Sequence, residues 1–415
     1  MPYNNTSSGR RPASSSRGGS SFGGGRSFGG RSGGGRSGGG GSRRPAKQYI
    51  NPSRFIKAAK PAVEVAPYVS THTFEDFEYE QLLKNNITAK GYVHPSPIQD
   101  QTIPYGLAGK DVVGIANTGT GKTAAFALPT LHRLLTEAHS RALIMAPTRE
   151  LAQQIEDELR SIAKGSGLAS AMLIGGSPMG PQLRDLRYGP NIVIGTPGRI
   201  KDHIERGTLD LSGFNIITLD EVDRMLDMGF IADIRFILSK LASPRQSFFF
   251  SATMEPKIEE LIRTFLSDPV VISVKTGATS DNVDQDVVEY GSGHEKIEKL
   301  HDILNQEHVA KVLVFDETQR SVERLSEELL ARGFKVNAIH GGKSQGQRQR
   351  ALKEFKDNRI NVLVATDVAA RGIDIADITH VINYTTPQTY DDYVHRIGRA
   401  GRAGRTGSAL TFIER

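Results

Sequence analysis

A glycine-rich turn is the strongest chemical signal in this 415-residue sequence. The segment ANTGTGKTAAFAL (116–128) joins an apolar run to a helical pattern. Such a turn frees backbone N–H groups to surround phosphates, and the N-terminus of the following helix adds a favourable dipole. Lys122 can reach the β- and γ-phosphates of a nucleotide, and the Thr123 hydroxyl can ligate Mg²⁺. The predicted phosphate cradle comprises Ala116, Asn117, Thr118, Gly119, Thr120, Gly121, Lys122 and Thr123.

This cradle departs from the usual pattern at its first position. Glycine normally stands six residues before the lysine, whereas this chain has Ala116. Gly119 and Gly121 are retained, and the order of strand, turn and helix is the one that phosphate binding needs. The alternative is a glycine-rich loop with an incidental lysine. We predict a P-loop that binds ATP together with Mg²⁺.

A second apolar run ends in three carboxylates. The stretch FNIITLDEVD (214–223) places Asp220, Glu221 and Asp223 after a predicted strand. Taken alone, it equally fits a buried strand that ends in a charged turn. In a P-loop ATPase an acid in this place faces Mg²⁺, so Asp220 is predicted to do so through coordinated water. Glu221 is predicted to orient or deprotonate the attacking water, and Asp223 to hold neighbouring elements together.

Composition excludes several other classes of protein. No stretch approaches about 18 consecutive apolar residues, so a membrane span is not expected. The sequence contains no cysteine and therefore has neither a disulfide framework nor a thiolate metal site. Its eleven histidines lack zinc-ligand spacing. These features favour a cytoplasmic protein.

The positive charge is concentrated in one part of the chain. The net charge is +6, but residues 1–60 carry 12 of the 52 Lys and Arg and none of the 46 Asp and Glu. Residues 61–415 therefore hold 40 basic against 46 acidic residues. A segment of Gly, Ser and Arg buries too little apolar area to fold, so the tail is predicted to be disordered. It is either a flexible RNA-binding arm or a plain linker.

Apolar runs alternate with helical patterns along the rest of the chain. This alternation predicts an α/β fold in two successive domains, each a mostly parallel sheet with helices on both faces. The expected strands lie within 111–116, 141–147, 191–197, 214–221, 247–253 and 270–274, and then within 311–317, 335–341, 361–367, 380–386 and 408–414. The expected boundaries are a basic tail at 1–60, a connector at 61–71, an ATP-binding domain at 72–275, a linker at 276–286 and a second domain at 287–415.

Together, these motifs resemble the DEAD-box family of ATP-dependent RNA helicases, with DEVD in place of DEAD. The resemblance covers about residues 72–415 and implies two RecA-like domains that close over ATP and RNA. GYVHPSPIQ (91–99), with Phe74 seventeen residues before Gly91, looks like the family's adenine-recognition element. It implies that Gln99 reads the adenine edge and that Phe74 packs on the ring.

Further matches imply contacts with the RNA backbone. They are PTRELA (147–152), Gly175-Gly176 and TPGR (196–199) in the first domain, and HGGKSQGQR (340–348) and ATDVAARGIDI (365–375) in the second. The implied RNA-contact residues are Pro147, Thr148, Arg149, Gly176, Thr196, Arg199, Arg348, Thr366 and Asp367. Threonine, arginine and helix N-termini can bind phosphates without reading bases.

The motif YVHRIGRAGRAGR (393–405) supplies the remaining implied groups of the second domain. Its Arg399 and Arg402 match the family's arginine fingers, which can be worth about 10³–10⁵ in rate. Asp374 matches the family's contact to the nucleotide ribose. The implied coupling residues, which link hydrolysis to strand separation, are Ser251, Thr253 and His395.

The chain departs from the family's pattern at Val222, Ala400 and Asp316-Glu317. None of these positions carries an implied catalytic group, and Val222 is expected to face the domain interior. The resemblance implies an ATP-dependent RNA helicase that needs ATP and Mg²⁺ and acts as a monomer, with ribosome or RNA-decay partners. The alternatives are an ATP-gated RNA clamp with little unwinding and a DNA translocase of the wider helicase superfamily.

Overall fold

The computed structural model describes residues 50–58, 68–117, 119–274, 282–370, 375, 377–401 and 406–415. The predicted site residues Thr118, Asp374 and Arg402 lie outside this set, as does the predicted tail up to residue 49. Residues Lys47–Arg415 belong to one compact unit, which contains both sheets. None of the described helices is long and apolar enough to cross a membrane.

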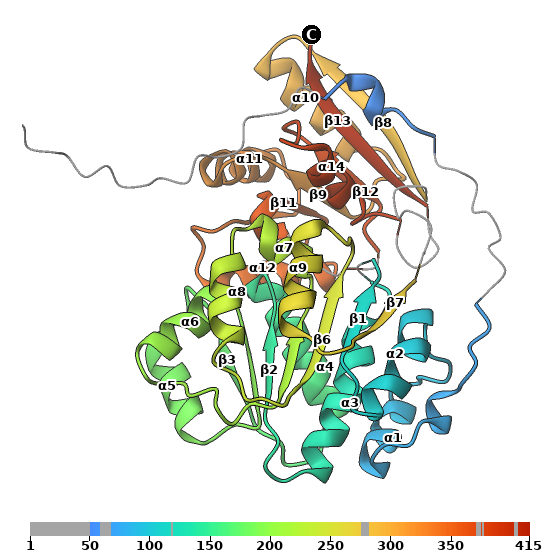
Figure 1. Cartoon of the computed structure of the whole chain (residues 1–415). Helices are drawn as coiled ribbons and strands as arrows, with labels where there is room; N and C mark the ends of the chain where they lie inside the picture. The colour runs from blue at the N-terminus through green and yellow to red at the C-terminus, as the bar shows by residue number, and fades with distance from the viewer. Residues whose placement is uncertain are drawn as a thin grey trace, which may run out of the picture. The chain divides into compact units, whose positions relative to one another are not determined.

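The first sheet consists of parallel strands in the order β3-β4-β2-β5-β6-β1-β7 (Figure 1). Its strands are β1 Val112–Ile115, β2 Ala142–Met145, β3 Ser170–Leu173, β4 Ile192–Gly195, β5 Ile216–Leu219, β6 Gln246–Ser251 and β7 Val270–Ser273. The helices are α1 Gln81–Ala89, α2 Pro97–Leu107, α3 Lys122–Thr136, α4 Arg149–Ile162, α5 Met179–Arg187, α6 Pro197–Glu205, α7 Val222–Asp227, α8 Ile231–Leu238 and α9 Pro256–Phe265, with a short 3₁₀ helix at Phe74–Asp76.

The second sheet is also parallel, in the order β10-β11-β9-β12-β13-β8. Its strands are β8 Val283–Tyr290, β9 Val312–Phe315, β10 Val336–Ile339, β11 Val362–Ala365, β12 His380–Asn383 and β13 Gly407–Glu414. The helices are α10 Gly293–Leu304, α11 Gln319–Ala331, α12 Gln345–Lys356, α13 Asp367–Ala370 and α14 Tyr390–Ile397, with a 3₁₀ helix η1 at Pro52–Phe55. The predicted fold class is confirmed.

Each sheet is buried on both faces. Val112 of β1 packs into one apolar cluster and Val113 into another, because successive strand residues point to opposite sides. In the second sheet, Leu313 and Val314 divide between two clusters in the same way. This two-sided burial explains why most strands are continuous apolar runs in the sequence. Val222 lies fully buried in one of these clusters, as expected.

Two predicted boundaries are wrong. Strand β8 begins at Val283, inside the predicted linker 276–286. Its sequence, VDQDVVEY, mixes acidic and amide side chains with apolar ones because β8 is an edge strand, and it therefore contains no long apolar run. Residues 50–58, which were assigned to the disordered tail 1–60, include η1 and the buried side chains of Ile50 and Phe55. These apolar side chains give the segment apolar surface that it can bury, which the Gly/Ser/Arg stretch lacks.

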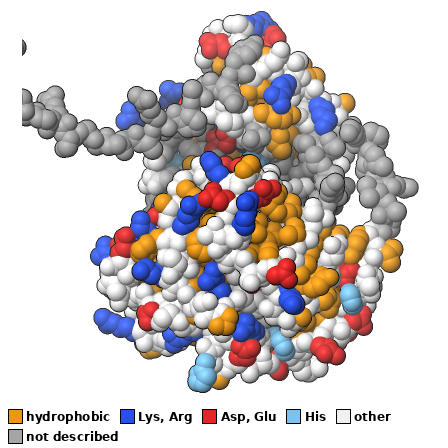
Figure 2. Space-filling model, viewed as in Figure 1, with side chains coloured by type: hydrophobic (Ala, Val, Ile, Leu, Met, Phe, Trp, Pro, Cys, Tyr) orange, Lys and Arg blue, Asp and Glu red, His pale blue; other side chains and the backbone are white. Residues whose placement is uncertain are grey.

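Charged side chains of both signs are interspersed over the face shown in Figure 2. This mixture agrees with the small negative balance of 40 basic against 46 acidic residues in 61–415. A general attraction of this face to a polyanion is therefore weak. The parallel strands instead bring chemically specific side chains to the edge where the strands end, since ligands of open α/β sheets bind at the carboxyl ends of strands.

Candidate functional site

The P-loop joins the end of β1 to the start of α3, as predicted. Gly119 and Gly121 have φ angles of 83° and 89°, in the left-handed region that favours glycine. A Cβ atom on Gly121 would lie 2.4 Å from Gln99 Nε2, so no larger residue fits there without a shift. Lys122 is the first residue of α3 and is buried. The loop thus leads its lysine to the N-terminus of a helix, where phosphates bind favourably.

The predicted adenine element is hydrogen-bonded to the P-loop. Gln99 Nε2 donates to the Gly121 carbonyl oxygen at 3.0 Å, and the Ser96 hydroxyl donates to the Thr120 carbonyl oxygen at 2.7 Å. The Ser96 N–H also donates to Gln99 Oε1 at 2.8 Å, which completes a capping box at the start of α2. The two motifs therefore form one unit. Ser96 was missed as a site residue, although its capping-box spacing to Gln99 is visible in the sequence.

Phe74 lies deeper than an adenine-packing ring would suggest. It is 3% exposed and packs on Phe77 and Tyr92, with ring centroids 6.2 and 5.7 Å away. Tyr92 is 36% exposed and covers Phe74. More aromatic surface is thus accessible on Tyr92 than on Phe74. The packing of Phe74 on adenine stays a prediction.

The acids after β5 lie beside the P-loop. Asp220 Oδ1 is 4.0 Å from Lys122 Nζ, and both side chains are buried. Lys122 Nζ also donates to the Ala116 carbonyl oxygen at 3.1 Å. Burial raises the pKa of Asp220 to about 6, while the Lys122 ammonium acts in the opposite direction. The carboxylate is thus held close to a positive charge that stabilises its ionised form.

Glu221 has an unusual backbone conformation. Its φ of 53° and ψ of 57° place it in the left-handed region, although it is not glycine. It caps α7, and its N–H donates to Asp220 Oδ1 at 2.9 Å. Such a conformation costs roughly 1–2 kcal/mol for a residue with a Cβ atom. Strain of this kind is concentrated at functional sites, which agrees with the predicted role of Glu221.

Asp223 connects two motifs, as its predicted role requires. Its Oδ2 accepts hydrogen bonds from the backbone N–H groups of Ala252 and Thr253, at 2.9 and 3.2 Å. These residues follow Ser251, the buried last residue of β6. The SAT segment and the acidic segment are therefore joined directly. A displacement of the SAT segment would therefore also move Asp223, and the reverse.

Six of the nine predicted RNA contacts, five from the first domain and Arg348 from the second, line one cavity of about 510 Å³. Thr148 caps α4, and its Oγ1 accepts from the Leu151 N–H at 3.2 Å. Thr196 stands at the N-cap position of α6. Two helix N-termini therefore open toward this cavity, where anions bind favourably. The predicted residues that line it are Pro147, Thr148, Arg149, Thr196, Arg199 and Arg348.

Gly176 lies against the side chain of Arg149. Its φ is 74°, and a Cβ atom at this position would lie 2.1 Å from Arg149 Nη1. A side chain at residue 176 would therefore push the Arg149 guanidinium out of place. Arg199 is also held, because its Nη1 donates to the Ser177 carbonyl oxygen at 3.1 Å. Of these two arginines, Arg199 is thus oriented by a backbone carbonyl, and Arg149 lies in space that only glycine at position 176 leaves open.

Arg348 of the second domain is paired with the first. Its Nη2 lies 2.7 Å from Glu150 Oε2, and both side chains are buried. Burial raises the pKa of Glu150, and the Arg348 charge opposes that rise. Glu150 was missed because its partner lies 198 positions away in the sequence. An RNA contact by Arg348 stays a prediction.

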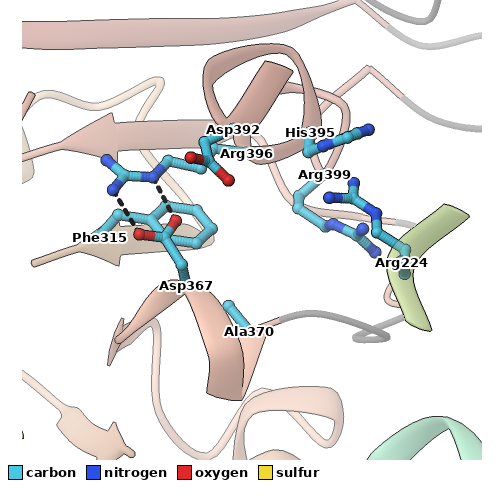
Figure 3. Close-up of a pocket in the computed structure, with 8 residues that line it drawn as sticks. All are labelled: Arg224, Phe315, Asp367, Ala370, Asp392, His395, Arg396 and Arg399. Carbon is cyan, nitrogen blue, oxygen red and sulfur yellow. Dashed lines mark hydrogen bonds and ion pairs between the residues drawn. The ribbon is translucent and has the colours of Figure 1, made fainter. Parts of the chain in front are cut away.

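Asp367 lines a different pocket from Arg149, Arg348 and the other predicted RNA contacts of the cavity. Its two carboxylate oxygens accept from Arg396 Nε and Nη2, at 2.5 and 2.7 Å (Figure 3). This pair lines a small pocket and not the cavity that contains Arg149. Thr366, the preceding residue, is buried. The carboxylate of Asp367 is thus occupied by an arginine, so an RNA contact through that group is not supported.

The same pocket contains His395 and Arg399. Figure 3 shows the side chains of Arg224, from α7 of the first domain, and Arg399 approaching each other. Arg224 and Arg396 were missed because their importance depends on contacts between distant parts of the chain. Arg399 therefore lies next to the helix that follows the acidic segment. Arg402 and Asp374 lie outside the described residues.

Comparisons with known proteins cover both domains. The DEAD/DEAH box helicase model matches residues 96–261, and the helicase conserved C-terminal domain matches residues 295–404. The chain is 45% identical over 345 residues to the DEAD-box ATP-dependent RNA helicase CshA of Bacillus subtilis (strain 168), covering 83% of this chain and 70% of that protein.

Two solved structures are similar to this one. One is S. cerevisiae Dbp5 bound to RNA and ADP BeF3, with a TM-score of 0.72 and 27% identity, covering 83% of this chain and 90% of that chain. The other is Mss116p bound to ssRNA and AMP-PNP, with a TM-score of 0.72 and 28% identity, covering 81% of this chain and 73% of that chain. The similarity extends across both domains, and it agrees with the two tandem RecA-like sheets and with the P-loop that lies beside Asp220. The chain therefore belongs to the DEAD-box family of ATP-dependent RNA helicases.

Proposed function

We propose that the protein hydrolyses ATP in response to RNA and uses this reaction to separate short RNA duplexes or remodel RNA–protein complexes. One observation carries the proposal. Five first-domain residues that are predicted to contact RNA line one cavity together with Arg348 of the second domain, while Lys122 of the P-loop and Asp220 lie close together where β1 and β5 end. RNA bound in that cavity would therefore favour the domain arrangement that hydrolysis needs.

The nucleotide residues fit ATP and Mg²⁺ chemically. Lys122 offers a buried cation at the N-terminus of α3, and Asp220 offers a buried carboxylate 4.0 Å from it. We propose that Lys122 binds the β- and γ-phosphates and that Thr123 and Asp220 hold Mg²⁺, which would neutralise phosphate charge. Gln99 would read adenine from a helix already fixed to the P-loop. Glu221 would accept a proton from the attacking water.

Replacing Glu221 with glutamine should slow hydrolysis by about 10²–10⁴-fold, because an amide cannot accept a proton. ATP binding should remain, since the phosphate cradle and Asp220 are unchanged. The variant should then remain on RNA as an ATP-bound complex. The measurement is single-turnover hydrolysis together with the dissociation rate from labelled RNA. Glu259→Gln, an exposed glutamate of α9, is the control; normal turnover by Glu221→Gln would remove the proposed role.

The affinity for Mg²⁺–ATP should depend on pH through Asp220. Its folded-state pKa is raised to about 6, so the carboxylate is ionised above that pH and protonated below it. Because a carboxylate must be ionised to attract Mg²⁺ through its coordinated water, Mg²⁺-dependent affinity should fall about tenfold per pH unit below 6. Titrations with a non-hydrolysable ATP analogue at pH 5–8, with and without chelator, measure this dependence. Asp220→Asn should flatten it; the same slope in that variant would assign the proton to another group.

The RNA half of the proposal is tested by turnover and strand separation. ATP hydrolysis should rise on addition of RNA oligonucleotides and much less on addition of DNA of the same sequence. A labelled short RNA duplex should separate in the presence of ATP. Turnover that is independent of RNA would contradict the proposal, and RNA-stimulated turnover without strand separation would limit it to an ATP-gated clamp. We further propose that the protein works as a cytoplasmic monomer.

A further inference from the structure

Residues 50–58 lie on the second domain, although they precede the first. Asn51 caps η1 by accepting from the Ser53 N–H at 3.0 Å. Lys57 forms an antiparallel bridge with Gln285 of the edge strand β8, with backbone N–H···O distances of 2.9 and 2.8 Å. Figure 1 shows this segment beside β8 and β13. We refer to residues 50–58 as the brace.

The brace packs on α14 through two side chains. Phe55 is 1% exposed, and its ring meets the ring of Tyr393 edge-on, with centroids 4.7 Å apart. The Arg54 guanidinium lies 3.6 Å from the centroid of the Tyr390 ring. Edge-to-face and cation–π geometries of this kind are both attractive. Two consecutive brace residues thus contact the first turn of α14.

A hydrogen bond joins these contacts to the sheet. The Tyr393 hydroxyl donates to Gln285 Oε1 at 2.9 Å, and Gln285 is the residue whose backbone pairs with Lys57. Phe55 and Tyr393 therefore belong to one assembly with β8. Because Tyr393 is fully buried, its hydroxyl needs hydrogen-bond partners within the protein, and Gln285 is one of them. The orientation of α14 is set on this side by the brace and by the strand that the brace covers.

The other end of α14 leads to the proposed arginine finger. Phe55 shares an apolar cluster with Ile397 and Ala400, which flank Arg399 in the sequence. Arg396, one turn after Tyr393, makes the bidentate pair with Asp367. Removing the Phe55 ring would leave a cavity on one side of α14, and the helix could move toward it. A shift of this kind would displace Arg399 from the pocket that contains Arg224.

We propose that the brace positions α14 and thereby Arg399, so that Phe55 is a positioning residue for ATP hydrolysis. The inference rests on the proposed function, because it assumes that Arg399 acts on the transferring phosphate. It predicts a specific kinetic signature. The brace should affect the rate of hydrolysis and leave ATP binding largely intact, because the phosphate cradle, Asp220 and Gln99 lie in the first domain.

The test uses the full chain and the variants Phe55→Ala, Ile56→Ala and Arg399→Ala. Phe55→Ala should lower RNA-stimulated kcat at least about tenfold, since a displaced catalytic group loses reactivity steeply with distance. Its KM for ATP should stay within about twofold of wild type, because uniform binding is unchanged. Ile56→Ala is the matched control, since Ile56 is the next residue and is 55% exposed; its kcat should be that of wild type.

A double mutant separates positioning from a general loss of stability. If Phe55 acts through Arg399, Phe55→Ala should have no further effect on kcat in the Arg399→Ala background. The inference would be overturned if the effects of Phe55→Ala and Arg399→Ala on kcat multiplied in the double mutant. A wild-type kcat in Phe55→Ala would also overturn it. Wild-type kcat in Arg399→Ala would instead remove the predicted role of Arg399 as an arginine finger, and turnover that is independent of RNA would contradict the proposed function, so these failures are distinguishable.

One variant avoids the core altogether. Arg54→Ala removes only the contact of a surface guanidinium with Tyr390, so it keeps the test valid if Phe55→Ala does not fold. It should lower kcat about threefold, in line with a cation–π contact of modest strength, and Arg54→Lys should restore part of the loss. An unchanged kcat in a folded Arg54→Ala variant, beside unchanged RNA binding, would contradict the proposed role of the brace.

Discussion

Replacing Lys122 with alanine should slow ATP hydrolysis at least about a hundredfold, because the ammonium is a pre-positioned charge aimed at the phosphates. The loss should have a second component. Lys122 opposes the effect of burial on the pKa of Asp220, so its removal should raise that pKa further and weaken Mg²⁺ binding at neutral pH. The measurement is steady-state turnover together with analogue binding at pH 7 and 8.

The control for this prediction is a lysine of the same domain with no part in the site. Lys110 is exposed and precedes β1, so it lies at the opposite end of the strand from the P-loop. Lys110→Ala should keep wild-type turnover and fold. If Lys122→Ala also hydrolysed ATP normally while folded, the P-loop assignment would have to be abandoned.

Arg399→Ala should slow hydrolysis by about 10³-fold or more, the range measured for arginine fingers. The reason is geometric. Arg399 belongs to the second domain but lies in a pocket with Arg224 of α7, the helix that begins directly after Glu221. A cation delivered in this way from the second domain can stabilise the transferring phosphate only when the two domains are correctly placed. Nucleotide binding should change little, and RNA-stimulated turnover should be lost.

An exposed arginine of the second domain gives the comparison. Arg359 precedes β11 and is therefore at the edge of the sheet away from the pocket. Arg359→Ala should keep both turnover and RNA binding. A near-normal rate in Arg399→Ala would mean that another cation serves the transition state, and Arg224→Ala would be the next variant to measure.

Local motifs could be predicted from the sequence, because their chemistry depends on neighbouring residues. The P-loop needs only a strand, two glycines with positive φ and a helix start, and all three are visible between Val112 and Lys122. The strand that ends at Asp220 is similarly recognisable as a continuous apolar run. The α/β class followed from the alternation of such runs with helical patterns. In these cases the apolar residues that make the pattern in the sequence are the residues that the fold buries.

Pairs between distant segments could not be predicted. Glu150 and Arg348 form a buried ion pair across 198 positions, and each residue alone looks like an ordinary helix residue. The carboxylate of Asp367 is taken by Arg396 for the same kind of reason. Strand β8 was not recognised because of its polar residues, and the brace was not recognised because it follows the Gly/Ser/Arg stretch. Tertiary contacts determine these features, and no local pattern reports them.

The backbone of Glu221 has a consequence for directed evolution. A glutamate with a φ of 53° holds roughly 1–2 kcal/mol of strain that glycine would not. Folded domains are stable by only about 5–15 kcal/mol, so the strain at Glu221 is an appreciable fraction of the free energy of unfolding. A library screened for heat resistance alone should therefore enrich Glu221→Gly, and the enriched clones should be inactive. Thermostable variants of this protein would have to be screened for turnover at every round, because stability and activity make opposite demands on this position.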